Sequence, residues 1–225
     1  MNAPQIFHRS IRRTARAAVV ALSLLSASAG AATAIKQNNS TNLNLSGSWS
    51  VLPGAGDVAQ WDATVAAANS PVLGGDVSWL GVKVVGPGGA VTIGDGNTLT
   101  LGASGVDLST ATQSLTLSCG VTLQGRQNWS AAAGRTVNVA GVFARTGAVV
   151  DFTGLNATAV LGTLTKDVSG ILGPWAVTGS GTALNYAKTT AGAVSAFTSQ
   201  TAATAGSLAN VSNPAVNYSL RRRRL

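Results

Sequence analysis

The acidic residues are the side chains of this sequence best suited to chemistry. All seven acids are aspartates, and the single histidine, His8, lies in a segment that we expect to be removed. This composition argues against Ser-His-Asp and Cys-His nucleophilic sites, His-based zinc sites and Glu-based acid/base pairs. Two Asp carboxylates held at the right separation still suffice for glycosidic cleavage. Paired aspartates are therefore the catalytic possibility to weigh.

Asp57 and Asp62 are the closest pair, and Trp61 beside them offers a ring on which a sugar could stack. Residues five apart on a strand face opposite sides unless a turn intervenes. We therefore expect Asp57 to belong to a Gly-Ala-Gly-Asp turn and Asp62 to lie at a corner. No catalytic residue is predicted.

Two glycine-rich motifs raise the question of a metal or cofactor site. Asp95 in Gly-Asp-Gly-Asn could line a calcium-binding turn, but the regular Gly-Gly-x-Gly-x-Asp series of calcium-binding repeats is absent. GDGNTL and GSGTAL resemble the start of a phosphate-binding loop, yet both lack the third Gly and neither opens a helical pattern. We predict plain turns, no metal site and no cofactor.

Cys119 and the tryptophans complete the candidates. A single cysteine cannot form an internal disulfide, and we expect Cys119 to pack within a strand. The tryptophans recur without fixed spacing and have two open roles, packing at corners or forming exposed platforms for carbohydrate. They are Trp49, Trp61, Trp79, Trp129 and Trp175.

The net charge of +8 comes from the two ends of the chain. Arginines cluster before residue 17 and again at 221–224, whereas acids and bases balance between Ile35 and Leu220. Nucleic-acid binding usually needs a basic stripe interleaved with aromatic residues, which this body lacks. We expect no nucleic-acid partner and a solvated or non-native tail at residues 221–225.

Residues 1–34 have the pattern of an export signal. An arginine-rich start precedes the apolar run AAVVALSLLSASAG, and Ala32-Thr33-Ala34 predicts cleavage after Ala34, with an alternative after Ala29. The run is too short and too rich in Ser and Ala to span a bilayer comfortably. We expect an exported protein at the extracellular or outer-membrane cell surface, held to a membrane only through a separate anchor.

Short runs of alternating apolar and polar residues, separated by glycine or proline turns, dominate the rest of the chain. Examples are Val91–Ile93, Thr98–Leu101, Ser114–Leu117 and Val121–Leu123, and alternation of this kind indicates β-strands with one buried face. The chain is therefore all-β. We expect inward positions at Ile93, Leu99, Leu101, Leu115, Leu117 and Leu123.

The strand-like pieces are short and similar to one another, which favours a right-handed parallel β-helix (β-solenoid) over the alternative, a β-sandwich. Coils of roughly 20 to 25 residues would give about seven to nine turns over Ile35 to Leu220. The β-helix repeat region should cover residues 35–165. A less regular repeat region should follow at 166–220. The sequence of this region predicts no terminal cap, as expected for a truncated protein.

Three longer stretches suggest a family. They are GAGDVAQWDATV, the run from DVSWLGVKVV to VNVAGVF, and SGILGPWAVTGSGTALNYA. The sequence resembles the autotransporter-associated β-strand repeat proteins of bacterial cell surfaces, which are similar to autotransporter passengers and adhesins. The resemblance covers most of Ser46 to Leu220 and implies a β-helix and no catalytic residues. This chain departs from the family in its short length and in lacking a translocator barrel.

These features together predict a non-enzymatic, exported, adhesin-like or structural surface protein. Its ligand would be a surface carbohydrate or a host matrix protein, bound along an extended face. The alternative is a polysaccharide-binding or polysaccharide-processing β-helix that uses Asp residues, and that alternative needs two facing carboxylates at about 5 to 9.5 Å beside a Trp.

Overall fold

The computed structural model describes residues 31–155, 160–161, 166, 169–179, 184–191, 193–198, 200–202 and 217–219. Most of the predicted export signal and the whole of the 221–225 tail lie outside these residues. None of the described residues forms a helix with the length and apolar character needed to cross a bilayer.

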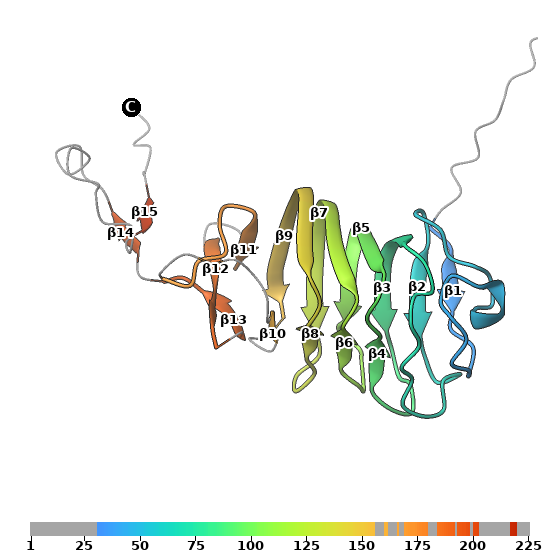
Figure 1. The fold of residues 1–225 in the computed structure, drawn as a ribbon. Helices are drawn as coiled ribbons and strands as arrows, with labels where there is room; N and C mark the ends of the chain where they lie inside the picture. Colours follow the sequence, from blue (N-terminus) through green and yellow to red (C-terminus); the bar gives the residue numbers. More distant parts are fainter. Residues whose placement is uncertain are drawn as a thin grey trace, which may run out of the picture. The chain divides into compact units, whose positions relative to one another are not determined.

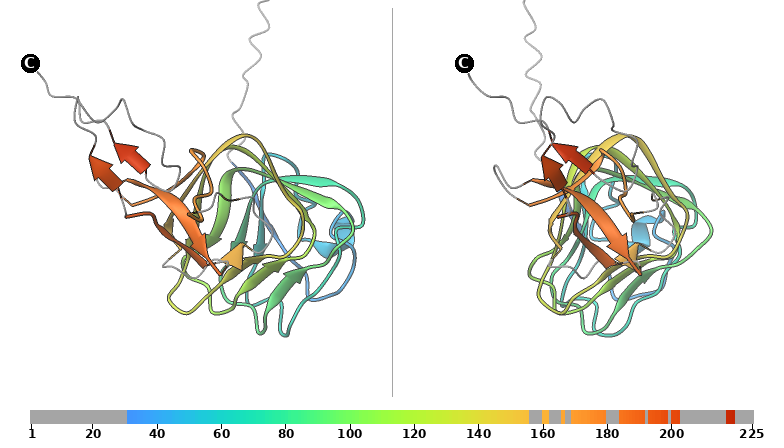
Figure 2. Two further views of the ribbon diagram at one scale, coloured as in Figure 1. Left: turned by 60° about the vertical axis from the view of Figure 1, so that its left-hand side comes forward. Right: turned by 90° about the vertical axis from the view of Figure 1, so that its left-hand side faces the viewer.

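Two parallel ladders of strands build the fold (Figure 1). The first ladder contains β1 (Thr33–Ile35), β2 (Val58–Trp61), β3 (Val77–Val84), β5 (Thr98–Leu108), β7 (Gly120–Ala131), β9 (Phe143–Gly154) and β11 (Ala176–Thr178). The second contains β4 (Val91–Ile93), β6 (Leu115–Leu117), β8 (Val137–Val139) and β10 (Val160–Leu161). From β3 onward the chain alternates between the ladders, and in Figure 2 its coils follow nearly the same closed path.

The register defines the coil length. Leu99 pairs with Val77 on one side and Val121 on the other, and Leu115 pairs with Val91 and Val137. The result is a β-solenoid of about six turns, which confirms the predicted parallel β-helix and rules out the sandwich. The expected seven to nine turns were too many, because the chain leaves the parallel course after β11.

The interior consists of side chains stacked in columns along the solenoid. All six residues predicted to face inward are fully buried, each at 0% exposure. Another column runs through Ala34, Ala59, Val82, Val106 and Trp129, which the register places in successive strands. Alternation along each strand thus places every second side chain in one continuous apolar core.

The strands of the first ladder are longer than the sequence pattern indicated. Strands β5, β7 and β9 continue through glycines that we expected to end them, namely Gly105, Gly125 and Gly147, whose φ angles are 59°, 67° and 62°. At Gly105 an added Cβ would lie 2.5 Å from the Asn128 carbonyl oxygen. These glycines bend the strand around a corner while pairing continues on both sides. The strand-like run of the sequence at Ser48–Leu52 does not form a strand: η1 (Ser46–Ser48) includes its first residue, and Trp49 makes an isolated bridge to Lys36.

The N-terminal edge of the first ladder is covered by the chain itself. The segment after η1 returns antiparallel to β1, with Lys36 bridged to Trp49. The Ser50 N–H donates to the Ile35 carbonyl at 2.8 Å, and the Gln37 N–H donates to the Ser48 carbonyl at 2.8 Å. Lys36 is buried there, and its Nζ donates to the Gln37 and Asn39 carbonyls and to Asn39 Oδ1.

The C-terminal end carries a cap that the sequence did not reveal. The hairpin of β12 (Asn185–Thr190) and β13 (Ala193–Ala196) is antiparallel, and it pairs with β11 through β12 and with β10 through β13. One hairpin therefore covers the last strand of both ladders (Figure 1). Its tight turn includes Ala191 at a φ of 49°. Strand β14 (Gln200–Ala202) pairs in parallel with β15 (Asn217–Ser219).

The tryptophans pack inside the solenoid. Trp49, Trp61 and Trp79 form one cluster with ring centroids 5.2 to 6.3 Å apart, mostly edge to face. Trp129 and Trp175 both contact Phe152 near the other end. All five are at most 7% exposed, so the alternative role as carbohydrate platforms was wrong. Edge-to-face pairs of this kind stabilise a core beyond the apolar area that they bury.

The Trp61 and Trp79 indoles provide a matched test of this core. Trp61 Nε1 donates to Asn69 Oδ1 at 3.1 Å, whereas Trp79 Nε1 is buried and finds no acceptor among the described residues. Trp61→Phe leaves a buried acceptor unsatisfied, but Trp79→Phe removes an unsatisfied donor with the same loss of volume. We expect Trp61→Phe to lower the free energy of unfolding by about 1 to 3 kcal/mol more than Trp79→Phe does. Urea denaturation followed by circular dichroism measures this difference, and equal losses would contradict it.

Candidate functional site

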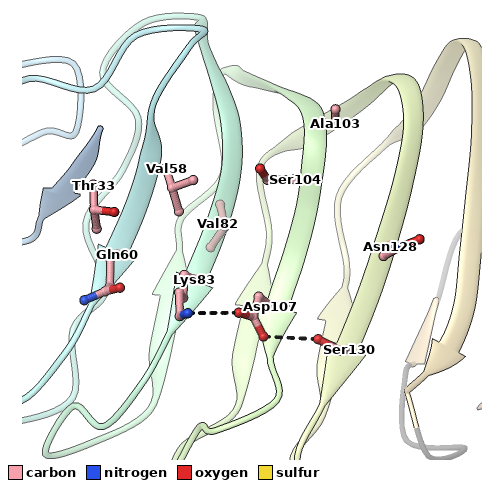
Figure 3. Close-up of a pocket in the computed structure, with 10 residues that line it drawn as sticks. All are labelled: Thr33, Val58, Gln60, Val82, Lys83, Ala103, Ser104, Asp107, Asn128 and Ser130. Atoms are coloured by element: carbon pink, nitrogen blue, oxygen red, sulfur yellow. Dashed lines mark hydrogen bonds and ion pairs between the residues drawn. The ribbon is translucent and has the colours of Figure 1, made fainter. Parts of the chain in front are cut away.

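A groove of about 530 Å³ lies on the outward side of the first ladder and is the candidate site (Figure 3). It crosses β1, β2, β3, β5 and β7, so it follows the long axis of the solenoid rather than any single strand. Its lining residues are Thr33, Val58, Gln60, Val82, Lys83, Ala103, Ser104, Asp107, Asn128 and Ser130.

A single outward column supplies the centre of this groove. The register pairs Gln60 with Lys83, Lys83 with Asp107, and Asp107 with Ser130. Their strand neighbours Ala59, Val82, Val106 and Trp129 form the inward column described above. Because side chains alternate along a strand, the packing of the inward column holds these polar groups on the outer face.

Asp107 is the most heavily bonded group in the groove. Its Oδ2 lies 3.2 Å from Lys83 Nζ, and its Oδ1 accepts hydrogen bonds from the Ser109 N–H at 3.0 Å and from Ser130 Oγ at 3.1 Å. Ser109 Oγ also donates to the same oxygen at 2.6 Å. Partial burial acts to raise the pKa of Asp107, but the bonds from Ser109 and the Lys83 ammonium outweigh it and lower that pKa to about 2.

The chemistry of the groove is that of a neutral, hydrogen-bonding surface. Lys83 and Asp107 neutralise each other, while the hydroxyls of Thr33, Ser104 and Ser130 and the amides of Gln60 and Asn128 offer donors and acceptors. Among the ten lining residues there is one carboxylate. A two-carboxylate glycosidase mechanism needs a second one across the bond that is cleaved.

The predicted Asp57 and Asp62 pair does not form a site. Asp57 Oδ2 accepts the Gly54 N–H at 2.9 Å, and Asp62 Oδ1 accepts the Thr64 N–H at 2.9 Å, so both carboxylates cap local turns. Trp61 points into the core at 0% exposure and is out of reach of a sugar. This confirms the expected turn and corner roles.

The other residues that the sequence suggested for a metal site or a reactive thiol lie in a turn or in the core. Asp95 is exposed in the turn between β4 and β5, and Cys119 is fully buried. Within the described part of the chain, no three His, Cys, Asp or Glu side chains cluster as a metal site would require. Most of the GSGTAL motif falls outside the described residues.

Sequence reasoning missed the groove residues, although a signal for them was present. Gln60, Lys83, Asp107 and Ser130 follow one another at intervals of one coil, and each occupies the same position within its strand. Aligning the coils by length, rather than by local pattern alone, would have grouped them.

Comparison of the chain with protein-family models, with curated proteins and with solved structures finds no match. The fold and the groove therefore define its class directly. It is a β-solenoid with a neutral polar groove on one outer face.

The bonds to Asp107 predict an acid-dependent loss of stability. The folded-state pKa of about 2 lies below the ordinary value of 3.8, so the ionised carboxylate stabilises the fold above about pH 4. That stabilisation is lost as the pH falls from about 4 to about 2. Urea unfolding at a series of pH values measures this loss. The difference in the free energy of unfolding between the wild type and Asp107→Asn should become smaller as the pH falls across this window. A gap that stays constant from pH 6 to pH 2 would contradict the assignment.

Burial also sets the reactivity of Cys119. Desolvation raises the pKa of its thiol from 9.0 to about 11, so the reactive thiolate is about a hundredfold rarer in the folded protein near pH 8. We expect alkylation of the native protein to be at least that much slower than alkylation of the urea-unfolded protein. Equal rates in the two states would place Cys119 at the surface instead.

Proposed function

We propose that this chain is a non-enzymatic, exported, adhesin-like surface protein that binds a linear carbohydrate in the outward groove of its solenoid. The observation that carries this proposal is the course of the groove across β1, β2, β3, β5 and β7. Neighbouring strands lie about 4.8 Å apart, so this surface extends over about 19 Å along the solenoid. An elongated ligand fits such a surface better than a compact one.

The lining groups support a carbohydrate as that ligand. Sugar hydroxyls both donate and accept hydrogen bonds, and the Gln60 and Asn128 amides and the serine and threonine hydroxyls do the same. Val58 and Ala103 add small apolar contacts beside them. The lysine of the groove is already paired with Asp107, which favours a neutral glycan over a polyanion.

The lining also favours binding over cleavage. Asp107 is the one carboxylate among the lining residues, and its lowered pKa keeps it ionised at neutral pH, which does not suit a general acid. The arginine-rich and apolar start of the sequence supports export, and the resemblance to surface repeat proteins supports a place on the cell surface.

A binding screen with two groove variants tests this function. The purified protein is applied to an array of polysaccharides and host matrix proteins, and the polysaccharides are also assayed for new reducing ends. Ser104→Trp should fill the groove and weaken glycan binding at least tenfold, and Asn128→Ala should weaken it several-fold by removing about 1 kcal/mol of hydrogen bonding. Thr116→Trp, on the outward side of β6 in the second ladder, is the matched control and should bind as the wild type does.

Three results would contradict the proposal. Release of reducing ends would make the protein an enzyme, and binding to matrix proteins alone would replace the glycan as ligand. Equal binding by Ser104→Trp and Thr116→Trp would place the binding surface outside the groove.

A further inference from the structure

Charge is separated along the solenoid, although its body as a whole is neutral. Residues 31–108, which include β1 to β5, carry five aspartates and two lysines, a net charge of −3. Residues 109–198, which include β6 to β13, carry five bases and two aspartates, a net charge of +3. The two halves follow one another along the solenoid axis (Figure 1). The first coils are therefore acidic and the last coils basic, so that the body has an electrostatic dipole along its length.

The two lysines of the acidic half are both occupied by local bonds. Lys36 is fully buried, and its Nζ donates to oxygens of its own turn. Lys83 Nζ lies 3.2 Å from Asp107. Asp57 and Asp76 accept backbone N–H groups and form no ion pair with a described residue. The surface of this half is thus open to a cationic partner.

The basic half presents an arginine at the end of an inward column. The register aligns Trp79, Leu101, Leu123 and Arg145 in successive strands. The first three side chains are buried, whereas Arg145 is exposed and its guanidinium lies 5.4 Å from the centroid of the Trp175 ring. Among the described residues it has no carboxylate partner. The cation–π contact holds this charge at the surface of the last coil.

Exposed large apolar side chains gather toward the same two ends. Those of the first coils are Leu45, Val51, Leu52 and Val72, and those of the last coils are Val142, Val149, Leu184 and Tyr186, each at least 37% exposed. Between residues 73 and 141 no large apolar side chain is exposed to this degree. Leu45 and Val51 flank η1, which is the outermost element at the first end of the solenoid (Figure 1). Apolar groups rimmed by charge are typical of surfaces that contact another protein.

We propose that copies of this chain associate head to tail, with the acidic first coils of one copy against the basic last coils of the next. Such a contact pairs opposite charges and covers apolar side chains on both partners, whereas contact between like ends opposes charges of the same sign. Because the two contacting surfaces differ, each copy keeps one free end and the assembly remains open. The arginines before residue 17 oppose the charge of the acidic end, so this inference rests on the proposed removal of the export signal.

Sedimentation of the purified protein tests this association. The full chain is expressed in a bacterial host, and its mass in solution is measured over a range of protein concentrations at about 10 mM and about 500 mM salt. At low salt we expect a series of oligomers that extends beyond the dimer as the concentration rises. At high salt the oligomers should dissociate, because the Debye length falls to only a few ångströms.

Two charge variants each block one end. Val51→Lys places a cation at the acidic end, and Arg145→Glu places an anion at the basic end, so each should weaken self-association at least roughly tenfold. An equal mixture of the two variants should form dimers and stop there, because each variant keeps one intact end. Thr116→Glu, on the outward side of β6 between the two ends, is the matched control and should associate as the wild type does.

Circular dichroism checks the fold of each variant, and the exposed positions Leu52→Lys and Lys166→Glu repeat the test at each end. A wild type that stays monomeric at low salt overturns the proposal, as does a closed dimer or equal association by the end variants and Thr116→Glu. Intact mass shows whether residues 1–30 have been removed. A chain that keeps them and still associates by its ends overturns export, while the head-to-tail contact stands.

Discussion

The continuity of the parallel backbone ladder is the constraint on which the rest of this structure depends. Each coil satisfies the hydrogen-bonding groups of the coil before it and presents a new edge to the coil after it. Such a stack has two ends, and both need cover. Here both are covered by antiparallel segments, the 48–50 return at β1 and the β12–β13 hairpin at β10 and β11. With a single buried cysteine, this cover comes from pairing rather than from a disulfide.

The interior and the outer face are products of the same alternation. Packing of one residue from each strand into the inward column places the next residue of that strand in an outward column. The inward column contains Ala59, Val82, Val106 and Trp129, and the outward column contains Gln60, Lys83, Asp107 and Ser130. The aromatic clusters near the two ends add edge-to-face contacts to this stack. The groove therefore needs no additional structural element, because the core that stabilises the coils also aligns the residues that line the groove.

Charge in the groove is balanced locally. The ion pair between Lys83 and Asp107 is more than a third exposed on the lysine side, so water screens it and its contribution to stability is small. Its greater effect is on the chemistry of the groove, because it leaves a surface of hydroxyls and amides with no free charge at its centre. That surface suits neutral, elongated partners, as the proposed carbohydrate is.

The sequence by itself determined the local features of this protein. Alternation predicted the all-β class and the inward leucines, and the recurrence of short runs predicted stacked coils. Both patterns can be recognised because each repeats within a few consecutive residues. What only the tertiary structure decided depends on pairing between distant residues. The hairpin cap, the burial of every tryptophan and the groove column of Lys83 and Asp107 all follow from register, which local pattern does not encode. Ala34 is a further example. Its local sequence matches the end of an export signal, and only the pairing with Ala59 of β2 shows that Ala34 belongs to the core.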